Sequence, residues 1–564
     1  MAVGVFFTCC VLYFSLVGPF SGTFFQQTRT FFYSAGYLQE TFFGIGGGAY
    51  ILGDFVSQFF VGNAAFVVIA AIFCACCFCL LCRLCAYQNP ALAPLSMIPA
   101  AALAVQHLGM HPFSAPAAAY FAALSALSLR HRIKEGKGRF IFSITMAAIL
   151  FPLFGPAATL FAAVVLVEEA FSASKLKDFL KYLSVPAVVA AIAVAAWQTG
   201  LSASALYPLT YKCYYSEEFA SLAVNGIPWI GTVAVVLIAA SLRKMKGKGL
   251  NIVAAAISLA VAIFMVVCLT ERYAGKSEQG FKELSVLSSR QDWDGVIEKC
   301  NSLKHSNMMF RNFQNLAFAH KGVLADQLFR YPCTDGSAVV INVDGKAIYQ
   351  RGVVSDIYLE MGSICTAQRY AFEALECMGN YSPQMLKRLV VTNLIYGHYP
   401  VAERYLKMLS ATIFYRKWAE EYVEFLCNDD LVNSDPFLGP KRRCVAHSDN
   451  YVYDLEGELN AALEASPLHT GTMQYLGSLY LLSGDTEGFI GFLERFYGTD
   501  ALPEVLPLYF QQAVLAYYYG YPESEEKTAE YNISRQQQEA FQTWLAAKVK
   551  DKTSLWSFLY NRHR

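Results

Sequence analysis

Residues 250–270 read LNIVAAAISLAVAIFMVVCLT, with no charged side chain. A helix of about twenty apolar residues crosses the ~30 Å hydrocarbon core of a bilayer, so this segment is expected to span a membrane. The chain before it is mostly apolar, with its charges in short islands, whereas the chain after it has the charge density of a soluble protein. The segment therefore divides the chain into a membrane domain, residues 1–270, and a water-soluble domain, residues 271–564.

The composition of the whole chain agrees with this division. Hydrophobic residues make up 55% of the 564 residues and charged residues 16%, below the ~25% that is typical of soluble domains. The 44 basic and 44 acidic residues give a formal net charge of zero. The sequence has no nucleic-acid-binding motif and no strongly basic balance, so we expect the lipid bilayer and not nucleic acid as a partner.

Long apolar runs that can satisfy their own backbone hydrogen bonds as membrane helices occur at about nine places, and only the run at residues 156–172 contains charged residues, Glu168 and Glu169 near its end. The first run has no basic residues before it, unlike a signal peptide, and is expected to remain as an anchor. The sequence thus predicts an all-α fold, a polytopic membrane domain followed by a soluble helical domain. The runs cover residues 2–20, 62–82, 92–109, 113–129, 140–154, 156–172, 184–200, 226–242 and 250–270.

Lys and Arg in the short connections predict the orientation, because cytoplasmic loops carry an excess of these residues. With a cytoplasmic N-terminus, the opposite side has only Arg29 and Lys212. An odd number of spans then places residues 271–564 outside the cytoplasm. The basic residues on the cytoplasmic side are Arg83, Arg130, Arg132, Lys134, Lys137, Arg139, Lys175, Lys177, Lys181, Arg243, Lys244, Lys246 and Lys248.

The first outer connection, residues 21–61, is rich in Phe and Tyr, which favour the membrane–water boundary. Residues 50–60 are predicted to form a short interfacial helix. Glu40 and Asp54 are the only acidic residues of this connection. A glycosyltransferase that uses a polyprenyl-phosphate sugar would need its catalytic base at this surface, so both residues are candidates for that base. The alternative is that they are solvated carboxylates of a loop.

A glycine run, GIGGG at residues 44–48, precedes the predicted interfacial helix. The backbone N–H groups of Gly46, Gly47 and Gly48 are candidates for binding a phosphate. The run lacks the Lys-Ser/Thr pair of a P-loop, so a turn is the alternative. No metal site or cofactor is predicted, because the cysteines of the second run spread around the helix and cannot converge on one ion. These cysteines are Cys74, Cys76, Cys77, Cys79, Cys82 and Cys85.

In residues 271–564, apolar residues recur at helical spacing and the predicted helices come in pairs with short turns. Gly362 and Gly397 align as turn glycines, and their separation is close to the ~34-residue period of a tetratricopeptide repeat. Gly322 and Gly484 fit the same pattern, and Gly477 is expected at a close contact between two helices. The sequence therefore predicts a tetratricopeptide-like domain, with an irregular helical domain as the alternative.

Two further features of this half lead to predictions. Residues 338–343 and 347–349, joined through Asp344-Gly345, are predicted to form a β-hairpin. Cys427 and Cys444 bracket a loop that contains Pro and Gly. Because disulfides form in oxidising compartments, a periplasmic location predicts a Cys427–Cys444 bridge.

Four segments resemble a family of bacterial multipass membrane proteins of unknown function with helical repeats at the C-terminus. They are GGGAYILGDFVSQFF (46–60), RNFQNLAFAHKGVLADQLF (311–329), TAQRYAFEALECM (366–378) and PVAERYLKMLSATIFYRKWAEEY (400–422). The resemblance implies an architecture and no reaction. The layout is also loosely similar to the polyprenyl-dependent, GT-C type glycosyltransferases. Those enzymes often carry an acidic pair just after the first span, where this sequence has GPFSG (18–22) and no acid.

Two functions from different classes follow. The first is a non-enzymatic envelope protein whose helical repeats bind a protein or peptide partner, because such repeats present extended binding surfaces. The second is a membrane glycosyltransferase that uses a lipid-linked sugar, with Asp54 or Glu40 as its base. The spans contain no central charged residue, which argues against a transporter.

Overall fold

The computed structural model describes residues 2–111, 114–172, 176–215, 219, 223–245, 247–303, 307–331, 335–343, 347–445, 455–547 and 553–562. These residues form helices and no strands, with one isolated bridge between Tyr497 and Leu502. The chain divides into unit 1, which is Met1–Glu283 with Ala411–Phe414, and unit 2, which is Leu284–Ser410 with Tyr415–Arg564. The boundary falls within helix α15 (Lys276–Ser289), later than the predicted boundary at residue 270.

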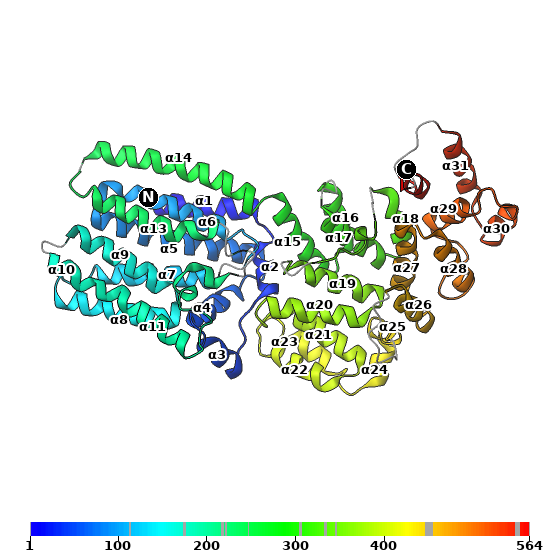
Figure 1. Cartoon of the computed structure of the whole chain (residues 1–564), viewed down its shortest axis with the longest axis horizontal. Helices are drawn as coiled ribbons and strands as arrows, with labels where there is room; N and C mark the ends of the chain where they lie inside the picture. The colour runs from blue at the N-terminus through cyan, green and yellow to red at the C-terminus, as the bar shows by residue number, and fades with distance from the viewer. Residues whose placement is uncertain are drawn as a thin grey trace. The chain divides into compact units, whose positions relative to one another are not determined.

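In unit 1 the long helices lie side by side (Figure 1). They begin and end as follows, with 3₁₀ helices labelled η: α1 Ala2–Val17, α2 Ser21–Thr28, α3 Ala35–Phe42, α4 Gly47–Ser57, α5 Asn63–Gln88, η1 Pro90–Ser96, α6 Met97–Gln106, α7 Ser114–Arg130, α8 Lys137–Phe154, α9 Ala157–Ser172, α10 Leu176–Leu180, η2 Lys181–Leu183, α11 Ser184–Gln198, η3 Tyr207–Leu209, η4 Tyr211–Tyr214, α13 Ala223–Ser241 and α14 Lys248–Tyr273.

Each of the nine predicted spans overlaps a helix, but fewer helices meet the requirements of a membrane span. Among the described residues, five are long and apolar enough, or six if α1 and α2, which are bent by 77°, count as one span. Helices α6, α7 and α9 have 10, 17 and 16 residues, fewer than the ~20 needed to cross hydrocarbon. The structure thus supports a membrane protein and leaves the nine-span count a prediction.

Helix α14 shows how the predicted span packs. Its buried residues are Ala254, Ser258 and Ala262, a stripe of small side chains spaced by four. This stripe lies against η1 and α6, where small residues allow close helix approach. Only 17% of its apolar stretch is buried, and Phe264 is 68% exposed. A helix this apolar with so little protein around it is suited to contact with lipid.

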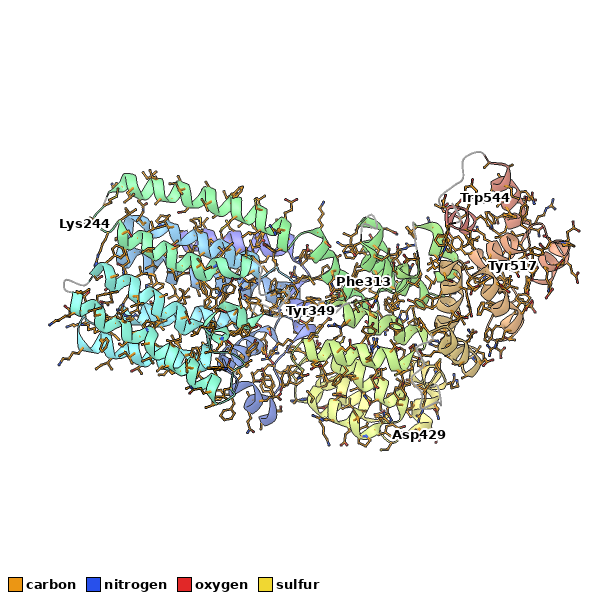
Figure 2. The ribbon with its side chains drawn as sticks, in the orientation of Figure 1. Lys244, Phe313, Tyr349, Asp429, Tyr517 and Trp544 are labelled. Atoms are coloured by element: carbon orange, nitrogen blue, oxygen red, sulfur yellow. The ribbon has the colours of Figure 1, made fainter. Side chains whose placement is uncertain are left out.

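The connections that follow α5, α9 and α13 meet at one end of unit 1. Asn89, after α5, donates from Nδ2 to Leu242 O after α13 (2.7 Å). Arg243 donates to Ser172 Oγ at the end of α9 (2.9 Å). Figure 2 shows Lys244 on the connection from α13 to α14, at the end of the unit where Figure 1 labels α10. The connections after α5, α9 and α13 are therefore neighbours, as strict alternation of the spans requires.

Unit 2 continues with helices that follow one another in pairs (Figure 1). They are α16 Trp293–Ser302, α17 Met308–His320, α18 Leu324–Gln327, η5 Leu328–Arg330, η6 Gly336–Ala338, α19 Gln350–Met361, α20 Ile364–Cys377, α21 Pro383–Tyr396, α22 Tyr399–Ser410, α23 Arg416–Val423, α24 Asp429–Ser434, α25 Leu438–Arg443, α26 Leu455–Ala465, α27 Thr470–Ser483, α28 Thr486–Phe496, α29 Leu508–Tyr517, α30 Ser524–Glu530, α31 Arg535–Ala546 and α32 Leu555–Arg562.

The turn glycines are where the sequence predicts them. Gly362, Gly397 and Gly484 each end the first helix of a pair with φ values of +92°, +74° and +73°. This left-handed conformation favours glycine, and it turns the chain directly into the next helix. Gly477 of α27 lies against the ring of Phe510 of α29, where a Cβ atom would overlap the ring. The prediction of a close helix contact at Gly477 is confirmed.

The predicted hairpin is wrong. Ala338 ends the 3₁₀ helix η6, the other described residues up to Tyr349 form turns and irregular chain, and Asp344 and Gly345 lie outside the described residues. Side chains of α17 satisfy this segment's backbone in place of a β-ladder. Asn312 accepts from Ile341 N (2.8 Å) and donates to Ala338 O (3.1 Å), and Asn315 also donates to Ala338 O (2.8 Å). These amides remove the need for a partner strand.

Candidate functional site

The predicted site residue Asp54 lies at the centre of a polar cluster in unit 1. Helix α2 ends at Thr28, and the extended residue Arg29 follows it. Ser34 caps α3 by accepting from Tyr37 N (3.2 Å), which fixes the first turn of that helix. Arg29 Nε lies 2.9 Å from both carboxylate oxygens of Asp54, and the Tyr37 hydroxyl donates to Asp54 Oδ2 (2.8 Å). Three consecutive elements thus converge on one carboxylate.

Burial determines what this carboxylate can do. The Asp54 side chain is 1% exposed and that of Arg29 is 16% exposed. Burial raises the pKa of Asp54, while Arg29 and Tyr37 oppose this by favouring the carboxylate. A general base must reach a substrate proton directly or through one water molecule. Asp54 instead accepts hydrogen bonds from two protein groups within the core, which is the arrangement of a structural ion pair.

Glu40, the other candidate base, lies on α3 in a different environment. Its side chain is exposed, whereas Asp54 is fully buried on α4. Glu40 and Asp54 therefore do not face solvent together. The exposed position leaves Glu40 accessible to molecules in water.

The three glycines are used for close packing. Gly46 has a φ of +78° and donates from its backbone N to Pro152 O (2.9 Å), and Gly47 N donates to Gly44 O (2.9 Å). A Cβ at Gly47 would overlap Thr41 O, and one at Gly48 would lie 2.9 Å from Leu153 O. Two of the three N–H groups are thus engaged by carbonyls. This geometry favours a tightly packed turn over a phosphate cradle.

The predicted bridge between Cys427 and Cys444 is not formed in the structure. Cys427 is an exposed free thiol and Cys444 a buried one. Cys444 Sγ is 3.4 Å from Pro440 O, one turn earlier on α25. Among the described residues no three His, Cys, Asp or Glu side chains are grouped as metal ligands.

Comparison with known proteins gives one match. The family model described as "Family of unknown function (DUF6057)" matches residues 1–558. The chain belongs to this family. No curated protein and no solved structure matches the chain. The family assignment covers both units, and it assigns no reaction to Asp54 or to any other residue.

Sequence reasoning missed a second charged cluster of this family member, at the end of α7. Arg130 is fully buried and donates to Glu168 Oε2 (2.6 Å), to Glu169 and to Ser143 Oγ (3.0 Å). His131 Nε2 lies 2.7 Å from Glu168 Oε1. In the sequence, the basic residues nearest to Glu168 and Glu169 are the lysines that follow them, Lys175 and Lys177. Arg130 pairs with both glutamates in the structure, because α7 and α9 pack together and bring residues 38 positions apart into contact.

A third cluster joins four elements of unit 2. Lys441 Nζ donates to Glu360 Oε2 (3.3 Å) and to His469 Nε2 (3.2 Å). His469 Nδ1 is 2.7 Å from Thr472 Oγ1, and His320 Nδ1 is 3.5 Å from Glu360. Helices α17, α19 and α25 and the start of α27 therefore meet at one buried charge network. Nothing in the local sequence links Glu360 to Lys441.

Opposed effects act on the pKa values in this network. Burial raises the pKa of Glu360, but Lys441, His320 and His469 outweigh it, and the net pKa is below its usual value. Burial lowers the pKa of His469 to about 4, and the charge of Lys441 acts in the same direction. His469 is therefore neutral at pH 7 and can accept from Lys441.

Lys282 of α15 is a buried amine held by uncharged oxygens. Its Nζ donates to Ser21 Oγ (3.0 Å), Leu108 O (2.9 Å) and Gly109 O (2.7 Å), all in unit 1. Burial lowers its pKa well below the usual value. The two carbonyls follow α6, so the amine caps the negative end of that helix. These contacts attach the start of α15 to unit 1.

Proposed function

We propose that the chain is a bacterial inner-membrane protein that presents a helical-repeat domain to a protein or peptide partner in cell-envelope biogenesis. Unit 1 is the anchor in this proposal. Its support is the exposed apolar surface of α14 and the other helices that are long and apolar enough to cross a membrane. The anchor positions unit 2 at the membrane.

The proposed topology has nine spans, a cytoplasmic N-terminus and a periplasmic unit 2. Its support is the clustering of the connections after α5, α9 and α13 at one end of unit 1. The connections after α9 and α13 carry basic residues expected on the cytoplasmic side, and Arg83 lies in the last two turns of α5. The short helices α6, α7 and α9 are the weaker spans. They pack among longer helices, which reduces their own contact with lipid.

The main support for partner binding is the repeated helix pair of unit 2. Pairs α19–α20 and α21–α22 both turn at a left-handed glycine, Gly362 or Gly397, and α20 packs on α21 between them. This pattern is typical of tetratricopeptide-like solenoids, in which each pair contacts its neighbours and one face is free to bind a partner. We therefore assign partner binding to unit 2.

The alternative function is a GT-C-like glycosyltransferase that acts on a polyprenyl-phosphate sugar at the outer face. The enclosed ion pair of Asp54 weakens this alternative, which then depends on Glu40. Loss of activity in Glu40→Gln would support the glycosyltransferase, because the amide keeps the shape of the side chain and cannot act as a general base.

A complementation experiment separates the two functions. Cells that lack the chain receive either the full chain, a chain that ends at Ser289, or Glu40→Gln, each present at the same level in the membrane fraction. A partner-binding protein requires unit 2, so the truncated chain should behave like no chain and Glu40→Gln like the full chain. The proposal is overturned if the truncated chain restores the envelope and Glu40→Gln does not.

A further inference from the structure

Helix α4 has its faces reversed relative to a helix at a protein–water surface. Its buried residues are small or polar, and its exposed residues are large and apolar. A surface helix in water instead turns its apolar stripe toward the core and its polar residues outward. The buried residues are Gly47, Ala49, Gly53, Asp54 and Ser57, and the exposed ones are Leu52, Phe55 and Val56, with Phe59 exposed just after the helix.

The exposed residues form one continuous stripe. Positions 52, 55 and 56 have the spacing i, i+3 and i+4, so they lie on a single face of α4, and Phe59 follows in the turn after Ser57. Phe55 and Phe59 are in edge-to-face contact at 5.7 Å between ring centroids. Phe42 and Phe43, at the end of α3, are also exposed. Phe31 contacts one side of Phe55 (5.6 Å between ring centroids) and Phe414 contacts Phe59 (6.5 Å), but these side chains remain about 40% exposed. The hairpin of α3 and α4 therefore presents an aromatic and aliphatic surface that the described residues cover only in part.

Close packing prevents α4 from turning this stripe inward. A Cβ at Gly53 would lie 2.6 Å from the backbone of Ser114 and Ala115, so α4 rests directly on the start of α7. One residue later, Asp54 is bonded to Arg29 and Tyr37. Rotating the helix would break the buried ion pair and force large side chains into space that only glycine fits. The reversed orientation is thus built into the fold.

The surroundings of α4 indicate what covers the stripe. Gly48 packs on Leu153 O of α8, which is one of the helices suited to crossing a membrane. Helices α3 and α4 contain no Lys or Arg, so their surface has no electrostatic attraction of its own for anionic groups. An apolar helix face of this kind, beside the end of a span, is suited to the boundary between headgroups and acyl chains.

We propose that the α3–α4 hairpin inserts its apolar stripe into the membrane interface, where lipid is the ligand of Leu52, Phe55, Val56 and Phe59. This inference rests on the proposed role of unit 1 as a membrane anchor. In this arrangement Asp54 orients α4, because its ion pair with Arg29 on the inner face determines which face contacts the lipid. Without basic residues in the hairpin, the insertion should not depend on the lipid charge.

Photocrosslinking in phosphatidylcholine nanodiscs tests this inference on the full chain. The photoreactive residue p-benzoylphenylalanine replaces Phe55 or, in a second variant, Phe59. The matched controls are Phe264 on α14, which should contact lipid as part of the anchor, and Tyr519 in unit 2, which is 59% exposed. Mass spectrometry measures the yield of lipid adducts. We expect Phe55 and Phe59 to give yields within a few-fold of Phe264 and at least about tenfold above Tyr519.

Three other results would contradict the inference. Adducts at Phe264 combined with yields at Phe55 and Phe59 as low as at Tyr519 would overturn the inference and leave the anchor intact. Crosslinks from Phe55 to a second chain would overturn it in favour of self-association. An absence of adducts at Phe264 would contradict the proposed anchor itself, and the inference with it.

Discussion

Asp54 and Arg29 form an ion pair in which a single nitrogen, Nε of Arg29, lies 2.9 Å from both carboxylate oxygens. The Arg29 guanidinium also lies over the ring of Tyr50, 5.0 Å from its centroid. A buried pair of this kind contributes little net stability as a whole. Removing one partner, however, leaves an uncompensated charge in the core. The ion pair therefore predicts different stabilities for the single and the double substitutions.

Asp54→Leu should destabilise unit 1 by about 3–5 kcal/mol, because Arg29 remains buried without its counter-charge. Arg29→Met should have a similar effect through Asp54. The double variant should recover much of the loss, since both charges are then gone. Thermal unfolding of the full chain in nanodiscs measures all three. Gln39→Ala is the control, because Gln39 is exposed on α3 and its substitution should change stability by no more than about 0.5 kcal/mol. Additive losses in the double variant would contradict the ion-pair assignment.

Gly477→Leu should destabilise unit 2 by about 1–3 kcal/mol, because its side chain would overlap the ring of Phe510. Gly491 on α28 is a matched control, since no atom lies within 4 Å of a Cβ placed there. Gly491→Leu should leave the unfolding temperature unchanged or raise it slightly, because leucine is the better helix former. Equal unfolding temperatures for the two variants would refute the close contact.

Local sequence patterns predicted most of the helices and several of their ends. The run at residues 250–270 became α14, and Gly362, Gly397 and Gly484 end helices as expected, because hydropathy and backbone preference act over short distances. The strand prediction at residues 338–343 was wrong because side chains of α17, more than twenty positions earlier, supply the hydrogen bonds of that segment. Propensity alone cannot anticipate such a tertiary override.

The pH dependence of unit 2 should reflect its buried histidine. The pKa of His469 is about 4 in the fold and 6.5 unfolded, so the unfolded chain takes up a proton first as the pH falls. Stability is therefore lost progressively below about pH 6.5, by about 2 kcal/mol at pH 5 from this residue. The pKa of His320 is also lowered, so protonation of His320 likewise destabilises the fold. The pKa of Glu360 is lowered too, so Glu360 stabilises the fold when it is ionised, and this contribution is also lost as the pH falls.

Hydrogen exchange measures this effect at the network itself. Peptides from α19 and α27 should exchange faster at pH 5 than at pH 7.5, after correction for the intrinsic pH dependence of exchange. In His469→Gln, which cannot be protonated, the corrected difference between the two pH values should shrink. The same difference in His469→Gln and the unaltered chain would show that another group controls the local opening.

Arg130→Met should destabilise unit 1 by about 3–5 kcal/mol, because Glu168 would be left buried beside Glu169 without the guanidinium that pairs with both. Arg132, two residues later, is exposed. Arg132→Met is thus the control for loss of a positive charge at the same end of the unit, and it should leave the unfolding temperature unchanged in nanodiscs. Similar losses in both variants would mean that net charge, and not the buried contact, stabilises this end.

The candidate site was less predictable than the fold. The sequence singled out Asp54 as an acid in an aromatic loop, but it did not reveal that Arg29, 25 residues earlier, encloses the carboxylate. Lys441 and Glu360 lie 81 residues apart, and only the packing of their helices brings them together. Charge pairs between distant elements follow from tertiary geometry. A local pattern predicts the residue types and leaves their partners open.

Topology reporters at the C-terminal end show whether unit 1 anchors the chain in the membrane and exposes unit 2 outside the cytoplasm. Alkaline phosphatase, which is active only in the periplasm, and green fluorescent protein, which is fluorescent after cytoplasmic folding, are fused separately after Arg564. If unit 2 is periplasmic, we expect high phosphatase activity and no fluorescence in the membrane fraction. Fluorescence without phosphatase activity would contradict this location, because unit 2 would then be in the cytoplasm and the number of spans would be even.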